Sequence, residues 1–525
     1  MLKKMLFILF WIFNITKITS QTEVANFQLD LKTNTSLILR SFSIFNDYNG
    51  KTATFIMEKK RAYIYLLNKN LEVEAKSEIE NLKKRYVHIV GNLFDDKDNY
   101  TLVLSNETKS KFASIHFNLS SGKISYEEDT YNFKNHLFLQ NLLFANENHL
   151  LFYDTKSSNI IARTYRIGKP CNNSIFKISK ETFYANEKKE IALKELLADY
   201  SNPNFRDIKN LEYELTKISE TPLITTSTPQ PFPSKRMVVL PTSIELASKL
   251  NKIYISGDSA IITLDKNKFF TQILTLNLKN NSYHLQKIKK PLFKEKAMLK
   301  ASNSFINDHF IFLIASSNDS LSIHIRDLKT KRIVKKFEAS ANDQSIDFIN
   351  TSFKQKGGAF DETRTITGTH NFLRKITQSN IGISILKNSN SSQMTIGSHK
   401  QALKGISTIY LASGLSHAVS SKQGNFQISF SNLNNSFSSY FTTKSIQSQA
   451  ILDKDFNYIT DTIPTNVFDE ITSFLMPPEI NEDGVYFEKD QFSPEKTAID
   501  VVKINNQIML GYFIAPTKTY HFVSF

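Results

Sequence analysis

Residues 114–126 read SIHFNLSSGKISY, and residues 273–285 read ILTLNLKNNSYHL. Each stretch is an alternating strand, a polar turn and a second strand, and residues 322–334 (SIHIRDLKTKRIV) repeat the pattern. Similar strand–turn–strand segments recur along most of the chain at a spacing of roughly 40 to 55 residues, which is typical of repeat architectures built from four-stranded sheets. We therefore predict an all-β fold, a β-propeller of roughly six to eight four-stranded blades with about seven expected.

The first predicted blade illustrates the pattern from which the others are assigned. Its strands are expected at residues 36–45, 52–57, 62–67 and 71–75, with a hairpin turn at 68–70. At the other end of the chain, residues 520–525 form an expected closing strand. Pairing of this strand with the amino-terminal half would remove the exposed edge of the ring.

The amino terminus predicts export. Lys3 and Lys4 precede an apolar run over residues 5–13, and polar residues follow up to Ser20 and Gln21. This is the layout of a signal peptide, and the apolar run is too short to span a bilayer. We expect a secreted or periplasmic protein of the cell envelope, without a transmembrane span in the mature chain. Cys171 is the single cysteine, so no intrachain disulfide can form.

A break in the strand rhythm divides the chain. Leu193, Leu196, Leu197 and Tyr200 fall on one helical face, and residues 208–218 suggest a second helix. Prolines and threonines then dominate up to residue 236, a composition that resists regular structure. We expect this insertion to contact a partner. The predicted domains are the signal peptide (1–21), the amino-terminal blades (22–183), the helical and Pro/Thr-rich insertion (184–236) and the carboxy-terminal blades (237–525).

Two short motifs resemble nucleophile sites but lack the residues that such chemistry needs. Gly257-Asp258-Ser259 would need a histidine three residues after an aspartate as its base, and the chain has none at that spacing. Residues 414–418 (GLSHA) lack the following helix of a nucleophile elbow. We interpret both as turns.

Acidic residues and histidines likewise indicate no metal site. Residues 95–99 (DDKDN) and 481–484 (NEDG) are expected to be solvated hairpin turns, because neither has the ligand order of a calcium loop. The 11 histidines show no zinc-ligand spacing. The sequence therefore predicts no catalytic residue, no cofactor and no metal.

Basic residues gather in two neighbouring repeats. The formal net charge is +15, and these residues could form one positive face for an anionic polymer such as an acidic polysaccharide. The alternative is that lysines protect outer strands from edge-to-edge association. Nucleic acid is not expected, because lysine dominates over the arginine that reads phosphates in a bidentate manner. The candidate residues are Lys287, Lys289, Lys290, Lys329, Lys331, Arg332, Lys335 and Lys336.

Together these features predict an exported, non-catalytic propeller that binds or scaffolds a protein or polysaccharide partner. The alternative is a glycan hydrolase or lyase whose carboxylates converge on the central channel. Such a site would be assembled from distant blades and would leave no local motif, so the sequence leaves this alternative open.

Overall fold

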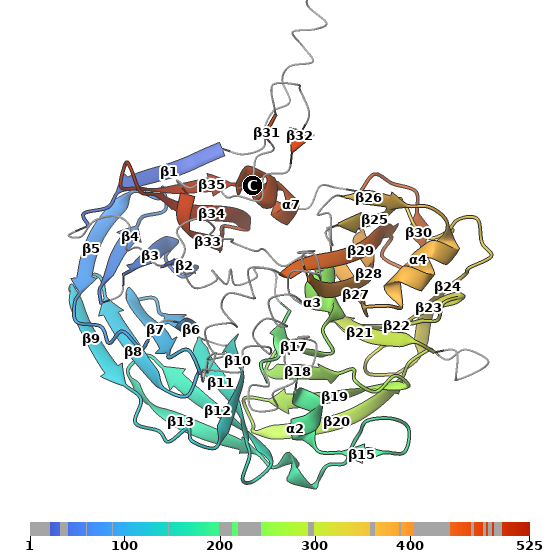
Figure 1. The fold of residues 1–525 in the computed structure, drawn as a ribbon. Coiled ribbons are helices and arrows are strands. Elements are labelled where there is room, and N and C mark those ends of the chain that lie inside the picture. The colour runs from blue at the N-terminus through green and yellow to red at the C-terminus, as the bar shows by residue number, and fades with distance from the viewer. Residues whose placement is uncertain are drawn as a thin grey trace, which may run out of the picture.

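The computed structural model describes residues 22–31, 40–58, 60–86, 88–144, 146–198, 213–218, 243–291, 299–356, 363–387, 390–403, 441–463, 467–475, 479–480, 486–487 and 496–525. Seven β-sheets are arranged around a central axis (Figure 1). In the regular blades, consecutive strands pair antiparallel through short turns, as the alternating sequence pattern predicts. The predicted seven-bladed propeller is confirmed.

Three regular blades come first along the chain. Blade 1 is β2 (Arg40–Asn46), β3 (Lys51–Met57), β4 (Ala62–Leu67) and β5 (Val73–Ile79). Blade 2 is β6 (His88–Phe94), β7 (Asn99–Ser105), β8 (Phe112–Asn118) and β9 (Lys123–Glu128). Blade 3 is β10 (His136–Phe144), β11 (Glu147–Asp154), β12 (Asn159–Arg166) and β13 (Lys169–Phe176).

Two further blades follow the break in the rhythm. Blade 4 is β17 (Asn251–Ser256), β18 (Ser259–Leu264), β19 (Phe270–Asn277) and β20 (Ser282–Lys289), with β16 (Thr216–Lys217) added in parallel beside β17. Blade 5 is β21 (Ala301–Asn307), β22 (Phe310–Ser316), β23 (Ser320–Asp327) and β24 (Ile333–Ser340).

Blade 6 departs from the sequential order. Its first three strands are β27 (Asn380–Lys387), β28 (Ser392–Leu403) and β29 (Phe441–Leu452). The next positions are filled by β25 (Phe353–Lys356) and β26 (Arg364–Ile366), which precede them in the chain, and β30 (Tyr458–Ile459) also pairs with β29.

Blade 7 closes the ring with both ends of the described chain. It contains β33 (Lys496–Ile504), β34 (Gln507–Ile514) and β35 (Thr519–Ser524), and its outer strand is β1 (Thr22–Gln28). β1 pairs antiparallel with β35, from Thr22 opposite Ser524 to Gln28 opposite Thr519. The expected pairing of the closing strand with an amino-terminal segment is confirmed, and it leaves the ring without a gap between first and last blades.

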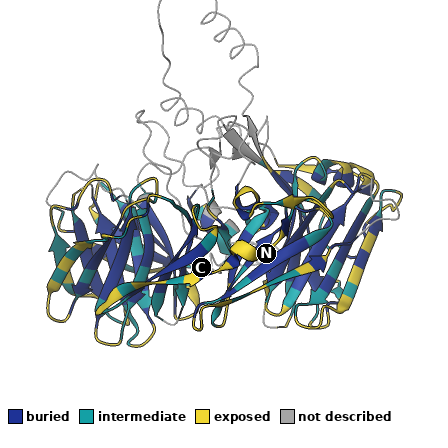
Figure 2. Cartoon of the chain, turned by 90° about the horizontal axis from the view of Figure 1, so that it is seen from below, coloured by how far each residue is buried: buried dark blue, intermediate teal, exposed yellow. Residues whose placement is uncertain are grey.

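The core lies between neighbouring blades. Figure 2 shows buried residues through the body of each blade and exposed residues at turns and rims. Phe55 of blade 1 contacts Phe117 of blade 2, with ring centroids 5.2 Å apart, and both rings are fully buried. Because each sheet hides both faces against its neighbours, the middle strands are almost wholly apolar, as in β4 (AYIYLL).

Part of the predicted insertion packs into the ring. The helix α2 (Leu193–Leu197) buries Leu193, Leu196 and Leu197 in a cluster shared with blades 3 and 4, and the Leu215 amide donates to the Leu139 carbonyl at 2.8 Å. The second predicted helix is wrong at its end, because residues 216–217 pair with β17 as a strand. Residues 213–215 are not helical either, and residues 208–212 and the Pro/Thr-rich stretch lie outside the described residues.

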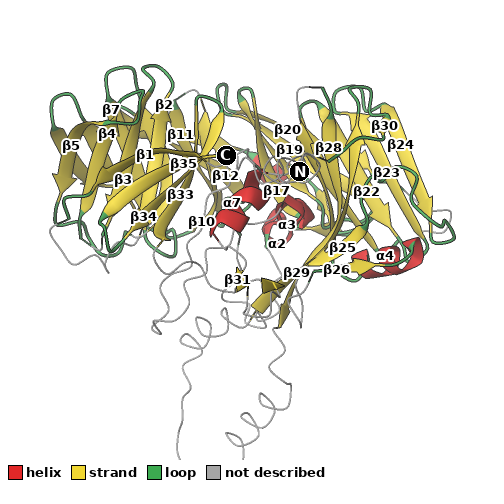
Figure 3. Ribbon diagram, turned by 90° about the horizontal axis from the view of Figure 1, so that it is seen from above, coloured by secondary structure: helices red, strands yellow, loops and turns green. Residues whose placement is uncertain are grey.

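The remaining elements are short. Besides α2, Figure 3 shows α3 (Ser243–Ser248) and α7 (Val467–Leu475) toward the middle of the ring and α4 (Thr369–Ile376) beside blade 6. In the part of the chain that the structure describes, no helix has the length and apolar character needed to cross a membrane. The other pieces are η2 (Ile178–Lys180) and the two-residue strands β14 (Phe183–Tyr184), β15 (Glu190–Ile191), β31 (Glu479–Ile480) and β32 (Tyr486–Phe487).

Candidate functional site

Four of the predicted basic residues lie on the outer strands of two adjacent blades, and Lys329, Lys331 and Arg332 lie in the connection between β23 and β24. β20 is the last strand of blade 4, and β24 is the last strand of blade 5 (Figure 1). Glu338 is the only carboxylate in these two strands. We call the surface-accessible members of the set the basic rim; they are Lys287, Lys289, Lys329, Lys331, Arg332, Lys335 and Lys336.

Two members of the basic rim have partners on neighbouring segments. The Lys287 ammonium lies over the Tyr184 ring, 3.8 Å from its centroid. Lys335 donates to Asn457 Oδ1 at 2.7 Å, which connects blade 5 to the loop before β30. Exposed contacts of this kind hold side chains in place with little net stabilisation.

Lys290 does not belong to this surface, although the sequence placed it there. It follows the last residue of β20 and turns inward, and its side chain has no exposed area. Its ammonium group forms an ion pair with Asp265 at 3.0 Å and donates to the Asn267 carbonyl at 2.8 Å. The expected eight-residue face therefore has seven members.

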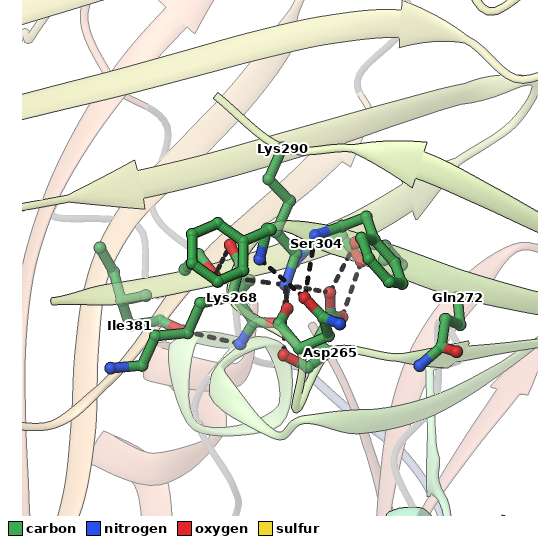
Figure 4. A network of polar contacts seen from close by, with 12 residues as sticks. Asp265, Lys268, Gln272, Lys290, Ser304 and Ile381 are labelled. Carbon is green, nitrogen blue, oxygen red and sulfur yellow. Dashed lines mark hydrogen bonds and ion pairs between the residues drawn. The ribbon is translucent and has the colours of Figure 1, made fainter. Parts of the chain in front are cut away.

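Asp265 is the centre of a buried polar network between blades 4 and 5 (Figure 4). The carboxylate lies 3.1 Å from the Lys252 ammonium and accepts hydrogen bonds from the Thr271 and Ser304 hydroxyls, each at 2.7 Å. Asp265, Lys252 and Lys290 have no exposed side-chain area. We call these three residues the blade 4–5 joint.

The joint also reaches blade 6. Lys252 donates to Asn303 Oδ1 on β21 at 2.8 Å. The Asn303 amide donates to the Ile381 carbonyl on β27 at 2.7 Å and to the Ser248 carbonyl in α3 at 3.0 Å. One buried network thus ties three consecutive blades and α3 together.

Two buried cations share one anion in this network. Burial alone would raise the pKa of Asp265, but Lys290 and Lys252 hold it below its ordinary value. Burial lowers the pKa of both lysines, and Asp265 offsets this effect in part. Because every charged group is hydrogen-bonded within the protein, the joint fits a structural role.

A second buried carboxylate lies where blade 7 meets blade 1. Asp500 Oδ2 on β33 accepts a hydrogen bond from the Ser43 amide on β2 at 2.5 Å. Beside it, Tyr520 donates to the Ser41 hydroxyl at 2.9 Å, and Ser41 donates to the Ala498 carbonyl. Burial raises the pKa of Asp500 to about 7. Gly511, opposite Asp500, is needed here because a Cβ at this position would come within 2.3 Å of the Tyr520 oxygen.

The buried carboxylates of the described chain lie in four different blades. They are Glu58 after β3, Asp98 in the β6–β7 turn, Asp265 and Asp500. Retaining and inverting glycosidases need two carboxylates within about 5 to 10 Å of each other. A glycan hydrolase would therefore need two carboxylates from different blades to approach each other, and this function stays an alternative prediction.

The turn motifs can be compared with their predicted roles. Gly257 and Asp258 form the hairpin between β17 and β18, with Ser256 paired to Ser259, so this turn is confirmed. The 95–99 segment is a hairpin tip, but Asp98 is buried rather than solvated and pairs with Lys51 at 3.1 Å. Within the described residues, no three His, Cys, Asp or Glu side chains are grouped as metal ligands would be.

Other predictions fall on residues outside those described. These are the signal peptide at 1–21, the turn at 414–418 and the turn at 481–484. Sequence reasoning missed Lys252 and Asp265. One feature of the sequence pointed to this network: Lys252 directly precedes the apolar residues of β17 (NKIYIS), and a buried cation at that position needs a buried partner.

No protein-family model and no curated protein matches the chain. Among solved structures, the Nup133 β-propeller domain of Vanderwaltozyma polyspora is 10% identical with a TM-score of 0.30, covering 95% of this chain and 97% of that one. The WD40 domain of fission yeast SCAP is 8% identical with a TM-score of 0.27, covering 96% and 89%. A prolyl endopeptidase is 8% identical with a TM-score of 0.27, and the match covers 67% of this chain but only 38% of that protein. These similarities are too distant to indicate a function.

Proposed function

We propose that this protein is an exported, non-catalytic β-propeller that binds a negatively charged protein or glycan partner through its basic rim. The observation that carries the proposal is the placement of seven cationic side chains on the outer strands of two adjacent blades and in the turn before β24; the two strands themselves contain a single carboxylate, Glu338. A positive electrostatic potential over the outer strands of two adjacent blades attracts a polyanion and accelerates its association.

The scaffold supports this role. The blade 4–5 joint ties the end of β20, through Lys290, to β21 of blade 5, through Ser304, by buried and hydrogen-bonded groups. The rim is therefore presented on a rigid body, and a partner does not have to order it on binding. The predominance of lysine favours a flexible polyanion over the planar, bidentate recognition of phosphates that arginine provides.

Binding to polygalacturonate, a linear carboxylated polysaccharide, tests the proposal, with neutral dextran as the control polymer. In Lys289→Glu/Lys329→Glu/Lys336→Glu, three exposed rim cations are reversed. We expect affinity for polygalacturonate to fall at least about tenfold. The matched control, Lys123→Glu/Lys134→Glu/Lys169→Glu, changes the net charge equally at exposed positions of blades 2 and 3.

An equal loss of affinity in both triple variants would show that net charge alone is responsible. An unchanged affinity in the rim variant would indicate that these lysines serve only to block strand association at the edges. Salt should weaken the specific binding, because exposed charges are screened over about 8 Å at physiological ionic strength.

Export is part of the proposal and rests on the sequence of residues 1–21. The full chain, produced in its own cells, should be recovered outside the cytoplasm, in the periplasm or medium. A version lacking residues 1–21 should stay in the cytoplasm. Cytoplasmic retention of the full chain would overturn this part of the proposal and leave the binding test unaffected.

A further inference from the structure

Blade 6 carries a second group of cations, on one face of its sheet. Gln355 lies opposite Arg364 on one side and opposite Ile446 on the other. Lys444 is two residues from Ile446 on β29, and it lies opposite Lys400 on β28. Because opposite residues and alternate residues of a sheet share a face, all five side chains project from the same face.

The helix α4 packs on this same face, next to β25 and β26 (Figures 1 and 3). The Phe372 ring stacks on Phe353 with centroids 4.2 Å apart. One turn further along α4, the Lys375 ammonium donates to Gln355 Oε1 at 3.1 Å. A fourth cation thus joins the group; we call Arg364, Lys375, Lys400 and Lys444 the blade-6 cluster.

This arrangement is unfavourable unless something compensates the charge. Like charges directly opposite each other in a sheet are destabilising, and Lys400 faces Lys444 in this way. Burial, together with Lys375, Arg364 and Lys400, lowers the pKa of Lys444. Burial and two nearby guanidinium groups, Arg364 and Arg374, lower the pKa of Lys375. Among the residues that the structure describes, no carboxylate forms an ion pair with any member of the blade-6 cluster.

An unsatisfied donor lies within the cluster. Gln355 is 1% exposed, and its side-chain Nε2 is buried without a hydrogen-bond partner in the described structure. A buried amide left in this state destabilises the fold relative to a hydrogen-bonded one. The cations and this amide offer donors only, so the missing complement is an acceptor with negative charge.

We propose that the blade-6 cluster binds a tetrahedral oxyanion, a phosphate or sulfate group that is either free or attached to a polymer. The Arg364 guanidinium offers two parallel donors to such a group, and the three ammonium groups supply compact charge around it. This site lies on a sheet face of blade 6, apart from the outer strands of blades 4 and 5. It does not depend on the function proposed above.

Thermal unfolding and calorimetric titration of the full chain test the site, with sodium sulfate and sodium phosphate as ligands and sodium chloride at matched ionic strength as the reference. We expect sulfate and phosphate to raise Tm beyond the effect of chloride. In Lys400→Gln/Lys444→Gln the affinity should fall at least about tenfold. The matched control, Lys123→Gln/Lys169→Gln, removes two exposed cations of blades 2 and 3, outside both proposed binding surfaces, and should respond as the wild type does.

A second measurement separates this role from a structural one. In chloride at low ionic strength, Lys444→Gln should melt at the same temperature as the wild type or higher, because the repulsion from Lys400 is relieved. A lower Tm for Lys444→Gln, an equal response of both double variants to sulfate, or no response beyond that to chloride would each overturn the proposal. Tighter binding of dextran sulfate than of inorganic sulfate, per sulfate group, that is lost in Lys400→Gln/Lys444→Gln would identify the polymer as the source, and equal binding would identify the free anion.

Discussion

Asp265 shows at the scale of single residues how the propeller balances polar groups in its core. It is the one anion between two buried lysines, and hydroxyls of β19 and β21 complete its hydrogen bonds. A buried ion pair adds little net stability compared with apolar packing, but loss of one partner leaves an uncompensated charge. The joint therefore fixes the relative position of neighbouring blades.

Substitutions at the joint should therefore lower the free energy of unfolding by unequal amounts. Asp265→Asn leaves two buried ammonium groups without an anion and should lower the free energy of unfolding by about 3 to 5 kcal/mol. Lys290→Met leaves one cation paired with one anion and should cost less. Urea denaturation of the two variants measures both values, and a smaller effect of Asp265→Asn than of Lys290→Met would contradict this account.

Asp500 predicts a pH effect at the seam between blades 7 and 1. Its folded pKa of about 7 lies above the ordinary 3.8, so the fold favours the protonated carboxyl. The stabilisation from this group is present below about pH 4 and is lost as pH rises toward 7, by up to about 4 kcal/mol. Asp500→Asn should therefore gain stability relative to the wild type as pH rises from 4 to 7.

The comparison between variant and wild type is essential, because buried histidines act in the opposite direction. Burial lowers the pKa values of His88, His149, His324 and His399 to about 4. Their protonation destabilises the fold, so they make stability rise with pH over the same range. A difference between the two unfolding curves that does not vary between pH 4 and 7 would rule out the assigned role of Asp500.

The residue scale is also where sequence reasoning was least successful. Lys289 and Lys290 are adjacent in the sequence, yet one is exposed and the other is fully buried. Their difference depends on Asp265, 25 positions earlier in the chain, and on the return of β21 beside it. No local pattern contains that information. The blade-6 cluster could not be predicted from the sequence for the same reason, because β25 and β26 join the sheet out of chain order.

At the scale of elements, α2 belongs to the ring rather than to a detachable insertion. Leu196 is 1% exposed in a cluster with side chains of blades 3 and 4. Leu196→Ala should lower the free energy of unfolding by about 2 to 5 kcal/mol, because it leaves a cavity in a packed core. Lys194→Ala, on the exposed face of the same helix, should change it by no more than about 0.5 kcal/mol. Similar small values for both variants would place α2 outside the core.

Strands were far more predictable than residue contacts. The predicted strands at 52–57, 62–67 and 520–525 match β3, β4 and β35 to within one residue. Period-two alternation and Asn-rich turns are local properties, and the sequence contains them in full. The predicted helix at 208–218 failed at Thr216 and Lys217 because a parallel pairing with residues 36 positions later in the chain outweighed the local periodicity.

At the scale of the whole molecule, closure of the ring makes the seven blades one cooperative body. The first described strand completes the last blade, so residues at the two ends of the chain share one sheet. The basic rim lies on two blades and the blade-6 cluster on a third, so the closed ring fixes where these surfaces lie relative to each other. Closure is thus the central claim.

A disulfide across the closing strands tests that claim most directly. Asn26 lies opposite His521 in the pairing of β1 with β35, so Asn26→Cys/His521→Cys in a Cys171→Ser background should oxidise to a crosslink that joins the two ends of the chain. The oxidised protein should unfold at a higher temperature than its reduced form. The control pair, Asn26→Cys/Ser524→Cys, is out of register and should stay reduced. Failure of the first pair to crosslink, or equal crosslinking of both pairs, would contradict the closed propeller.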